Sequence, residues 1–351
     1  MLNNIAIAGF KSFGSKVLVP LGQLNALIGA NGSGKSNFLA AFSFIQAFSF
    51  DQITKYVAEQ GGANKILHYG SRSTKSLSIN VTFEEGGHYS FQFHPTVDDS
   101  LRIGKDYTVA YVGTFERDSK LEWKDIIYRL QAWRLYHFHD TSFHSLMKKK
   151  SMLHDNRFLR QDGSNIASFL YLLREKHEES YRMIRNMVRQ VAPFFDDFVL
   201  EPAALNPDTI LLEWRHKNSD AYFDASSLSD GTLRFMALAT LLLQPTELRP
   251  EIVLLDEPEL GLHPYAIAVL AAMMRSASHE TQIVAATQSP TLLDHFEAED
   301  VLVAERVRGE TRLSRLKAEP LREWLEDYSL GQLWEKNHFG GRPAREGADT
   351  G

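Results

Sequence analysis

The spacing of apolar residues predicts a chain in which strands and helices alternate. The segment QLNALIG at 23–29 is typical of a buried strand, and SNFLAAFSFIQAF at 36–48 is typical of a helix with an apolar face. The segments 76–85, 88–95 and 107–117 alternate apolar and polar residues with a period of two, and EEGGHY is a turn between the first two. This pattern predicts an antiparallel sheet after the first helix.

The pattern changes twice further along the chain. From 121 to 193 it becomes helical, with apolar residues at 3- and 4-residue steps over 162–193. Beyond it, strands and helices alternate, which indicates parallel strands joined by right-handed crossovers. The predicted strands lie at 195–202, 209–216, 221–227, the start of 251–264, within 282–290 and at 300–306, and the helices lie within 226–244, at 264–278 and at 290–297.

These elements predict an α/β fold with a mixed or parallel central sheet flanked by helices, an antiparallel β subdomain and a helical lobe. We predict an N-terminal lobe, a short helical insert, a C-terminal lobe and a tail, at 1–120, 121–194, 195–335 and 336–351. The insert is too short for a long coiled-coil arm.

Composition excludes several classes of protein. The 351 residues carry a net charge of −6, so nucleic acid would be bound by a local patch, and the absence of cysteine excludes disulfides and thiolate metal sites. No stretch reaches the roughly 18 apolar residues of a membrane span, and MLNNIAIAGF lacks the basic and long apolar regions of a signal peptide. We expect a cytoplasmic protein with no membrane partner.

The stretch GANGSGKS at 29–36 fits the spacing GxxxxGK[ST]. Its glycines let backbone N–H groups approach phosphate oxygens, and the helix that follows adds its positive N-terminal end. Lys35 would contact the β- and γ-phosphates, and Ser36 would hold Mg²⁺. A flexible glycine turn is the alternative, but the strand before the loop and the helix after it favour a phosphate site. The predicted nucleotide-binding residues are Gly29, Asn31, Gly32, Ser33, Gly34, Lys35, Ser36 and Asn37.

Two adjacent acids follow a predicted strand in EIVLLDEPELGLHP at 251–264. Asp256 at the strand end can hold the water shell of Mg²⁺, and Glu257 can polarise an attacking water. A helix N-cap is the alternative interpretation of such a pair. Together with the glycine loop, the pair predicts a nucleotide hydrolase.

The segment SSLSDGTLRFMALATLLLQ at 226–244 predicts a second helix start that can receive an anion. Ser229 and the N–H groups of Asp230, Gly231 and Thr232 lie at this start. Because one active site does not need two such starts, two copies of the chain facing head to tail would use both.

These motifs resemble a known family. AGFKSFGSKVLVPLGQLNALIGANGSGKSN at 8–37 resembles the head segment of SMC proteins, LSDGT at 228–232 is similar to the signature of ABC-type ATPases, and LLDEPELGLHP is similar to the Walker B and D-loop run of OLD and RecF-like ATPases. The motifs run in the family's order from about 8 to 290. The chain is similar to the compact bacterial "predicted ATPase" group, AAA_21-like, in the SMC/RecF/OLD branch of the ABC superfamily.

The resemblance implies an ABC-type P-loop NTPase head in which two heads enclose two ATP molecules with Mg²⁺. Lys35, Ser36 and Asp256 would bind Mg–ATP, and Glu257 would be the general base. Ser229, Asp230 and Gly231 would close the partner's nucleotide, with Leu262 and His263 in the D-loop at the dimer interface.

Two positions depart from the family pattern. Gln288 stands where the switch histidine usually lies, and its amide can donate to the γ-phosphate but cannot titrate near neutral pH. We expect slow turnover; a capping or interface role for Gln288 is the alternative. His263 replaces the usual D-loop acid, so communication across the interface would differ.

The Q-loop is not identified by its usual residue. Gln46 lies too early, inside the first helix, and the better candidate is WRLYHFHDTS at 133–142 with His137, His139 and Asp140. These residues and His144 also have metal-like spacing. A strand end or a γ-phosphate sensor loop is the preferred interpretation.

Basic clusters allow a partner with phosphate groups. They are Lys148, Lys149 and Lys150, the helical row Arg182, Arg185 and Arg189, and the group Arg306, Arg308, Arg312 and Arg315. An ordinary solvated face is the alternative for each.

Three functions agree with these features to different degrees. The leading hypothesis is an ATP-driven homodimer that acts on DNA or on an effector or nuclease subunit, in repair or anti-phage defence. After residue 320 there is no room for a Toprim nuclease, so chemistry on DNA would need that partner. A slow nucleotide-sensing scaffold that restrains a toxic effector is the second hypothesis. A transporter nucleotide-binding subunit is the third, and GFKSF, LSDGT and ELGLHP argue against it.

Overall fold

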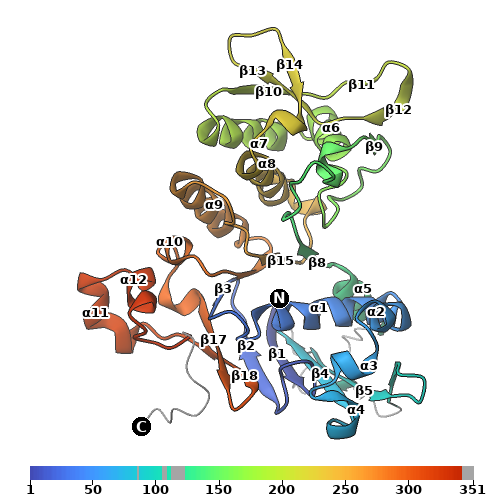
Figure 1. Ribbon diagram of the computed structural model, residues 1–351, viewed down its shortest axis with the longest axis vertical. Coiled ribbons are helices and arrows are strands. Elements are labelled where there is room, and N and C mark those ends of the chain that lie inside the picture. Colours follow the sequence, from blue (N-terminus) through green and yellow to red (C-terminus); the bar gives the residue numbers. More distant parts are fainter. Residues whose placement is uncertain (85–86, 105–108, 112–122, 342–351) are drawn as a thin grey trace. The chain divides into compact units, whose positions relative to one another are not determined.

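The computed structural model describes residues 1–84, 87–104, 109–111 and 123–341. The chain forms two units, Met1–Trp133 with Val284–Gly351, and Arg134–Ile283 (Figure 1). Residues 85–86 of the predicted turn EEGGHY, most of the predicted strand at 107–117 and most of the predicted tail lie outside the described residues. The predicted domain boundaries at 120, 194 and 335 were placed by the motifs and differ from the boundaries of these two units. The four-part division stays a prediction.

The first unit contains the predicted antiparallel sheet. Strand β4 (Leu77–Phe83) buries every second side chain and pairs antiparallel with β5 (Gly87–Pro95), as the period-two pattern indicates. The strand order is β2-β1-β4-β5-β6, with β7 also paired to β5. The remaining strands are β1 (Leu2–Ala8), β2 (Val17–Pro20), β6 (Leu101–Ile103) and β7 (Val109–Tyr111).

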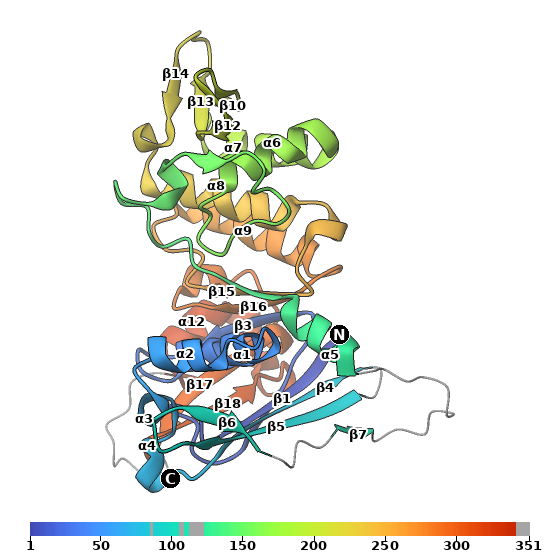
Figure 2. The same ribbon diagram turned by 90° about the vertical axis from the view of Figure 1, so that its right-hand side faces the viewer.

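Helix α1 (Lys35–Ser49) covers one side of this sheet (Figure 2). The ring of Phe44 lies 4.9 Å from the ring of Phe93, and Phe48 lies 5.4 Å from the same ring, with each pair edge to face. The apolar face of the predicted helix is therefore the face that packs on β5.

A second sheet of the first unit carries the strand that leads into the glycine loop. Strand β3 (Leu24–Ile28) is buried at every position and pairs in parallel with β17 (Val301–Val307). Strand β17 pairs antiparallel with β18 (Glu310–Arg315). The helices of the unit besides α1 are α2 (Ile53–Glu59), α3 (Ala63–Ile66), α4 (Gly70–Ser73), α5 (Trp123–Gln131), α10 (Pro290–Leu293), α11 (Arg322–Asp327) and α12 (Leu330–Glu335).

The second unit combines helices with small antiparallel sheets. Its sheets have the orders β10-β13-β14 and β11-β12-β9. The strands are β9 (Ser151–Met152), β10 (Phe195–Val199), β11 (Pro202–Ala203), β12 (Asn206–Ile210), β13 (Glu213–His216), β14 (Tyr222–Asp224) and β15 (Ile252–Asp256), and β8 (Trp133–Tyr136) begins at the boundary. Strand β16 (Gln282–Ala286) belongs to the second unit at its start and to the first at its end.

The prediction of helix from 121 to 193 is wrong for its middle, where the strand end that was preferred for 133–142 is present as β8. Helices α5, α6 (Ile166–Lys176) and α7 (Glu178–Val191) form, but 133–165 is strand, loop and one 3₁₀ turn at Leu146–Lys148. Aromatic residues alternate in WRLYHFH and favour a strand, and Ser, Asp, Asn and Gly then interrupt any helix.

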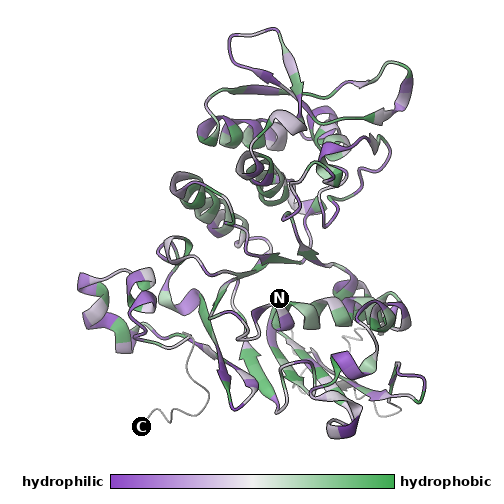
Figure 3. Cartoon of the chain, in the orientation of Figure 1, coloured by the Kyte–Doolittle hydropathy of each residue, from purple (hydrophilic) through white to green (hydrophobic). Residues whose placement is uncertain are grey.

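Helices α8 (Asp230–Leu243) and α9 (Pro264–Ala277) pack against each other, and α7 packs against both. Figure 3 shows that apolar residues predominate along α9 and β15. Helix α8 is buried on all sides from Leu233 to Leu242. Over the described residues, we find no helix with the length and hydropathy needed to cross a bilayer.

Candidate functional site

The glycine loop of the first unit leaves β3 in a conformation that only glycine adopts readily. Gly29, Gly32 and Gly34 have φ angles of 152°, 78° and 108°. A Cβ at Gly29 would lie 2.3 Å from the main-chain oxygen of Ala304, whereas a Cβ at Gly32 would meet nothing within 4 Å. Glycine is therefore required at position 32 only because of the backbone angle. At position 29 it is required both by the backbone angle and because there is no room for a Cβ.

Lys35 begins α1 and its side chain folds back over the loop. Its Nζ donates to the main-chain oxygens of Gly29 at 2.6 Å and Ala30 at 3.2 Å, and the residue is 6 % exposed. No side chain of the described residues caps α1, and its first turn holds no acid. The N–H groups of a helix start and a nearby ammonium make this end of α1 receptive to an anion.

The neighbours of Lys35 differ in exposure. Ser36 is exposed, so its hydroxyl is accessible, and the amide of Asn37 donates to Ser12 Oγ at 2.8 Å. Ser33 is 3 % exposed, and its hydroxyl makes no hydrogen bond to any residue that the structure describes. A buried polar atom without a partner inside a glycine loop is typical of a site that a polar ligand completes.

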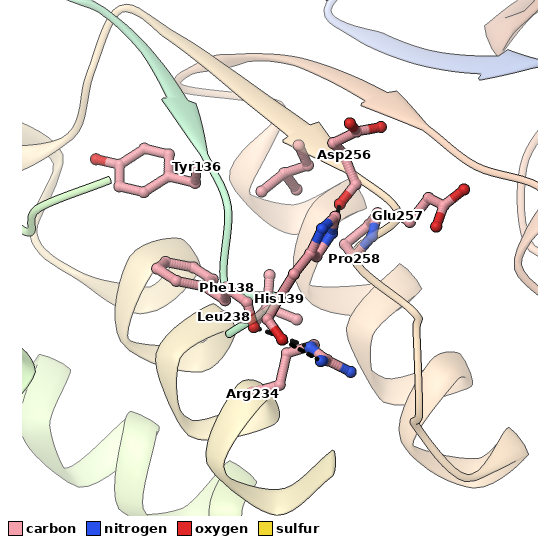
Figure 4. A pocket seen from close by; sticks show the side chains of 9 residues that line it. Tyr136, Phe138, His139, Arg234, Leu238, Asp256, Glu257 and Pro258 are labelled. Carbon is pink, nitrogen blue, oxygen red and sulfur yellow. Dashed lines mark hydrogen bonds between the residues drawn. The ribbon is translucent and has the colours of Figure 1, made fainter. Parts of the chain in front are cut away.

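In the second unit, β15 ends at the two predicted acids. Ile252–Leu255 are buried, and Asp256 and Glu257 are half-buried. Glu257 has a φ of 43°, a left-handed conformation that costs a non-glycine residue about 1–2 kcal/mol. Pro258 follows, two residues beyond the end of the strand at Asp256. The turn points the two acids from the same strand end in different directions (Figure 4).

The segment predicted as a Q-loop lies against this strand end. His139 Nε2 lies 2.6 Å from the main-chain oxygen of Asp256, and because a carbonyl only accepts, Nε2 carries the proton. Burial lowers the pKa of His137, and the charge of Asp256 opposes that shift. His139, Asp256 and Glu257 line one small cavity of about 10 Å³, near the smallest that holds a water (Figure 4).

The other residues of this segment have different surroundings. The carboxylate of Asp140 accepts from the Ser142 N–H at 3.0 Å, and hydrogen bonding from Ser142 lowers its pKa. No group of three or more His, Asp or Glu side chains able to hold a metal ion occurs in the described part of the chain.

Arg234 of α8 is a site residue that the sequence motifs did not single out. Its Nε donates to the main-chain oxygen of Phe138 at 3.0 Å, and Nη2 donates to that of His139 at 3.1 Å. Nη1 donates to the main-chain oxygen of Leu260. The guanidinium, which points toward the 138–139 segment in Figure 4, thus joins α8 to two loops. A charged residue within the apolar run TLRFMALATLLL was the available signal.

The burial of this guanidinium is nearly complete. Arg234 is 5 % exposed, and burial lowers its pKa while Asp230 raises it. Main-chain oxygens satisfy the buried donors, which is the condition under which a buried charge is tolerated.

Ser229 forms the N-cap of α8. Its Oγ accepts from the Thr232 N–H at 3.2 Å. Asp230 lies 3.8 Å from Lys148 Nζ, which also donates to the Thr141 main-chain oxygen at 2.6 Å. A Cβ at Gly231 would lie 2.4 Å from the main-chain oxygen of Gly261, so the start of α8 packs directly on the turn before Leu262.

The D-loop and switch residues lie at helix starts. His263 is the N-cap of α9, and its Nδ1 accepts from the Tyr265 N–H at 3.2 Å. Gln288 follows β16, but Ser289 is the residue that caps α10, with its Oγ accepting from Leu292 at 3.1 Å. The N-cap of α10 is therefore Ser289 and not Gln288, and the role of Gln288 stays a prediction.

The predicted site residues divide between the two units. The glycine loop with Lys35, Ser36 and Gln288 belongs to the first unit, and the remaining motifs belong to the second. Those of the second unit are Ser229, Asp230, Gly231, Asp256, Glu257, Leu262 and His263.

Several of the basic residues predicted to contact phosphates already have acidic neighbours. Arg185 lies 2.9 Å from Asp197, and Arg189 lies 2.8 Å from Asp196. Lys149 and Lys150 are exposed. In the group near the C-terminus, Arg315 is held by the main-chain oxygens of Pro20 at 2.7 Å and Glu299 at 2.6 Å.

Comparison with families places the chain by sequence. The AAA_21 profile, described as "AAA domain, putative AbiEii toxin, Type IV TA system", matches residues 24–294, well over half of the chain. Urease accessory protein 2 of Cryptococcus neoformans is 39 % identical over 82 residues, 23 % of this chain and 6 % of that protein. Structural maintenance of chromosomes protein 3 of Saccharomyces cerevisiae is 32 % identical over 90 residues, 25 % of this chain and 7 % of that protein.

Solved structures of SMC heads share the fold. The SmcHead bound to the C-winged helix domain of ScpA has a TM-score of 0.62 at 16 % identity, and covers 92 % of this chain and 99 % of its own. The Pyrococcus furiosus Smc head bound to the C-terminal domain of ScpA has a TM-score of 0.61 at 14 % identity, with coverages of 93 % and 98 %. The SMC head from Thermotoga maritima has a TM-score of 0.51 at 17 % identity, with coverages of 90 % and 99 %. The predicted α/β fold of an SMC-like head is confirmed.

Proposed function

The chain belongs to the AAA_21 family of AAA domains, and on that premise we propose that it binds and hydrolyses ATP with Mg²⁺ as two copies joined head to tail. Family and fold support an ATPase of the SMC and ABC type. The observation that carries the proposal is the glycine loop, in which Lys35 is folded over Gly29 and Ala30 at an uncapped helix start.

The phosphate chain of ATP fits this loop. Lys35 exchanges its main-chain partners for phosphate oxygens, which are the stronger acceptors because they are charged. The N–H groups at the start of α1 donate to the same phosphates. The unpartnered hydroxyl of Ser33 gains an acceptor when a phosphate enters.

Ser36 and Asp256 would hold the Mg²⁺. Both supply oxygen, the donor that Mg²⁺ prefers, and neither side chain is fully buried. The ion neutralises charge on the phosphates when it is bound. The hydrogen bond from His139 to the main-chain oxygen of Asp256 restrains the strand end that carries this carboxylate.

Glu257 is the proposed base. The oxygen of a water attacks the γ-phosphorus, the bond to the β–γ bridging oxygen breaks, and ADP leaves as the water's proton passes to Glu257. The left-handed backbone of Glu257 directs its side chain away from Asp256, so one acid serves the metal and the other the water. The amide of Gln288 donates to the γ-phosphate but does not carry a proton in either direction.

A second copy completes the site in this proposal. The start of α8 presents Ser229 and Gly231 as a second anion-receptive helix terminus, and the acid of its first turn, Asp230, is partly neutralised by Lys148. In this proposal each nucleotide lies between the start of α1 of one copy and the start of α8 of the other.

A partner beyond the second copy belongs to the same proposal. The SMC heads of the matched structures are bound to ScpA domains, which supports a protein partner here. The exposed Lys149 and Lys150 support a contact with DNA phosphates. A slow nucleotide-sensing scaffold that restrains an effector is the second candidate, because Gln288 lacks a titratable group.

The test compares the full chain with Glu257→Gln, Lys35→Ala and Ser229→Arg. ATP affinity, hydrolysis rate and mass in solution are measured for each. We expect Lys35→Ala to lose ATP binding, Glu257→Gln to bind ATP and accumulate as a dimer without turnover, and Ser229→Arg to bind ATP as a monomer. Equal hydrolysis by wild type and Glu257→Gln would remove Glu257 as the base. ATP-dependent dimerisation that survives Ser229→Arg would contradict the head-to-tail arrangement.

A further inference from the structure

A chain of hydrogen bonds ties the glycine loop to strand β18, at the other end of the sequence. Thr311 is fully buried, and its Oγ1 lies 2.8 Å from the main-chain oxygen of Ser33 and 2.7 Å from Ser12 Oγ. Asn37 donates to the same Ser12 hydroxyl at 2.8 Å. All four residues belong to the first unit.

The direction of each bond follows from the number of protons. A hydroxyl has one proton, and the Ser33 carbonyl can only accept, so Thr311 donates to Ser33. Ser12 must therefore donate to Thr311, and it accepts from the Asn37 amide. Donation runs one way, from Asn37 through Ser12 and Thr311 to Ser33.

This order determines how the peptide between Ser33 and Gly34 is turned. In a planar trans peptide, the C=O and the following N–H point in opposite directions. With the Ser33 carbonyl held toward Thr311, the Gly34 N–H points away from β18. A peptide rotated the other way would present an oxygen, and repel a phosphate, where the loop needs a donor.

The same strand fits closely against the loop at other points. A Cβ at Gly34 would lie 2.0 Å from Thr311 Oγ1, so the backbone of the loop rests on this threonine. The Thr311 N–H donates to the Ser12 main-chain oxygen at 2.8 Å. Next to it, Glu310 accepts from the Ser15 hydroxyl at 2.6 Å. Two consecutive residues of β18 therefore hold both ends of the segment from Ser12 to Ser15.

We propose that Thr311 and Ser12 are positioning residues of the phosphate site, which hold the Gly34 N–H in the direction from which it donates to a phosphate oxygen. The inference rests on the proposed nucleotide function of the loop. In this inference both residues act through the Ser33 carbonyl, Thr311 directly and Ser12 through Thr311.

Thr311→Val tests the inference because it removes the hydroxyl and keeps the shape. Thr311→Ser keeps the hydroxyl and is the rescue variant. Thr240→Val is the matched control, because Thr240 is also fully buried and donates to a main-chain oxygen, that of Met236 at 2.7 Å, in the other unit. ADP affinity by calorimetry, the melting temperature and the Gly34 amide resonance in glycine-labelled full-length protein are measured for all.

We expect Thr311→Val to weaken ADP binding about tenfold, as the loss of one hydrogen bond implies. The change in chemical shift of the Gly34 amide on adding ADP should also be smaller in this variant. Thr311→Ser should restore both the ADP affinity and this change in shift. Thr240→Val should lower the melting temperature and leave both readouts unchanged.

Three outcomes would overturn the inference. The first is that Thr311→Val has the ADP affinity and the Gly34 amide shift of wild type. The second is that Thr311→Ser fails to restore these two readouts. The third is that Thr240→Val reduces them as much as Thr311→Val does. In each of these the wild type still binds ADP, so the proposed function stands. A wild type that binds no ADP would overturn the proposed function and this inference together.

Discussion

The Nε2 of His139 donates to the main-chain oxygen of Asp256 at 2.6 Å. This bond joins the segment after β8 to the end of β15, where both proposed acids lie. A second element, α8, reaches the same segment through Arg234. The side chain of His139 therefore contacts the strand end, and Arg234 holds the main chain of His139.

Replacing His139 should slow hydrolysis more than it weakens ATP binding. His139→Leu removes the donor that restrains Asp256, and loss of such an outer contact typically costs about 10–100-fold in metal affinity or activity. Single-turnover rates and ATP affinity at fixed Mg²⁺ measure the two effects separately. His139→Gln, which keeps a donor, should retain more activity, and equal rates for the two variants would argue against a role for this bond.

Arg234→Met should destabilise the second unit and disturb the start of α8. It leaves the main-chain oxygens of Phe138 and His139 without their donors, and each lost bond to a charged group is worth about 1.5–3 kcal/mol. Arg234→Lys should rescue little, because an ammonium lacks the planar fork of donors.

Urea unfolding gives the free energy for these variants. The matched control is Arg182→Met on the exposed face of α7, where the nearest acid is Glu178 at 3.9 Å. This change should alter the free energy of unfolding by less than about 0.5 kcal/mol. If Arg234→Met lowered the free energy of unfolding by no more than this control does, the result would contradict the role of Arg234 in connecting α8 to the two loops.

Gly231→Ala should impair ATP-dependent dimerisation while leaving nucleotide binding to one chain intact. The added Cβ would lie 2.4 Å from the main-chain oxygen of Gly261, so the start of α8 or the turn must move. Gly22→Ala is the control, since its Cβ would meet Leu24 at an ordinary 3.6 Å. Light scattering with Glu257→Gln as the background detects the dimer, and a normal dimer for Gly231→Ala would count against the signature contact.

Gln288→His should raise the rate of hydrolysis and make it depend on pH near neutrality. An imidazole titrates there and can carry a proton, whereas an amide cannot. Steady-state rates between pH 6 and 9, compared with wild type and Gln288→Ala, measure the effect. A pH profile for Gln288→His that matches wild type would show that position 288 does not face the reacting phosphate.

Glu310 should contribute stability that depends on pH. Its hydrogen bond from Ser15 lowers its pKa from the ordinary 4.5, so the folded state favours the charged form. The contribution is present above pH 4.5 and is lost as pH falls through the lower pKa of the folded state. The difference in urea midpoint between wild type and Glu310→Gln should therefore shrink from pH 7 toward pH 3, and a constant difference would contradict this role.

The local pattern of residues was enough for the elements and for the motifs. Alternation over 76–95 predicted the hairpin of β4 and β5, and the glycine spacing at 29–34 predicted a loop between β3 and α1, because both signals lie within a few consecutive residues. Turn formers at 143–165 were misread as helix, whereas the strand end preferred for 133–142 forms β8. There the periodicity was weak, and the choice between strand and loop depended on packing.

Sequence alone determined the type of most elements, the order of the motifs and the family to which they belong. The tertiary structure decided which side chains hold those motifs in place. Thr311 reaches Ser12 across 299 positions, and Arg234 reaches Phe138 across 96. No local pattern records such contacts, because they exist only after the chain topology, such as the parallel pairing of β17 with β3, has brought distant segments together.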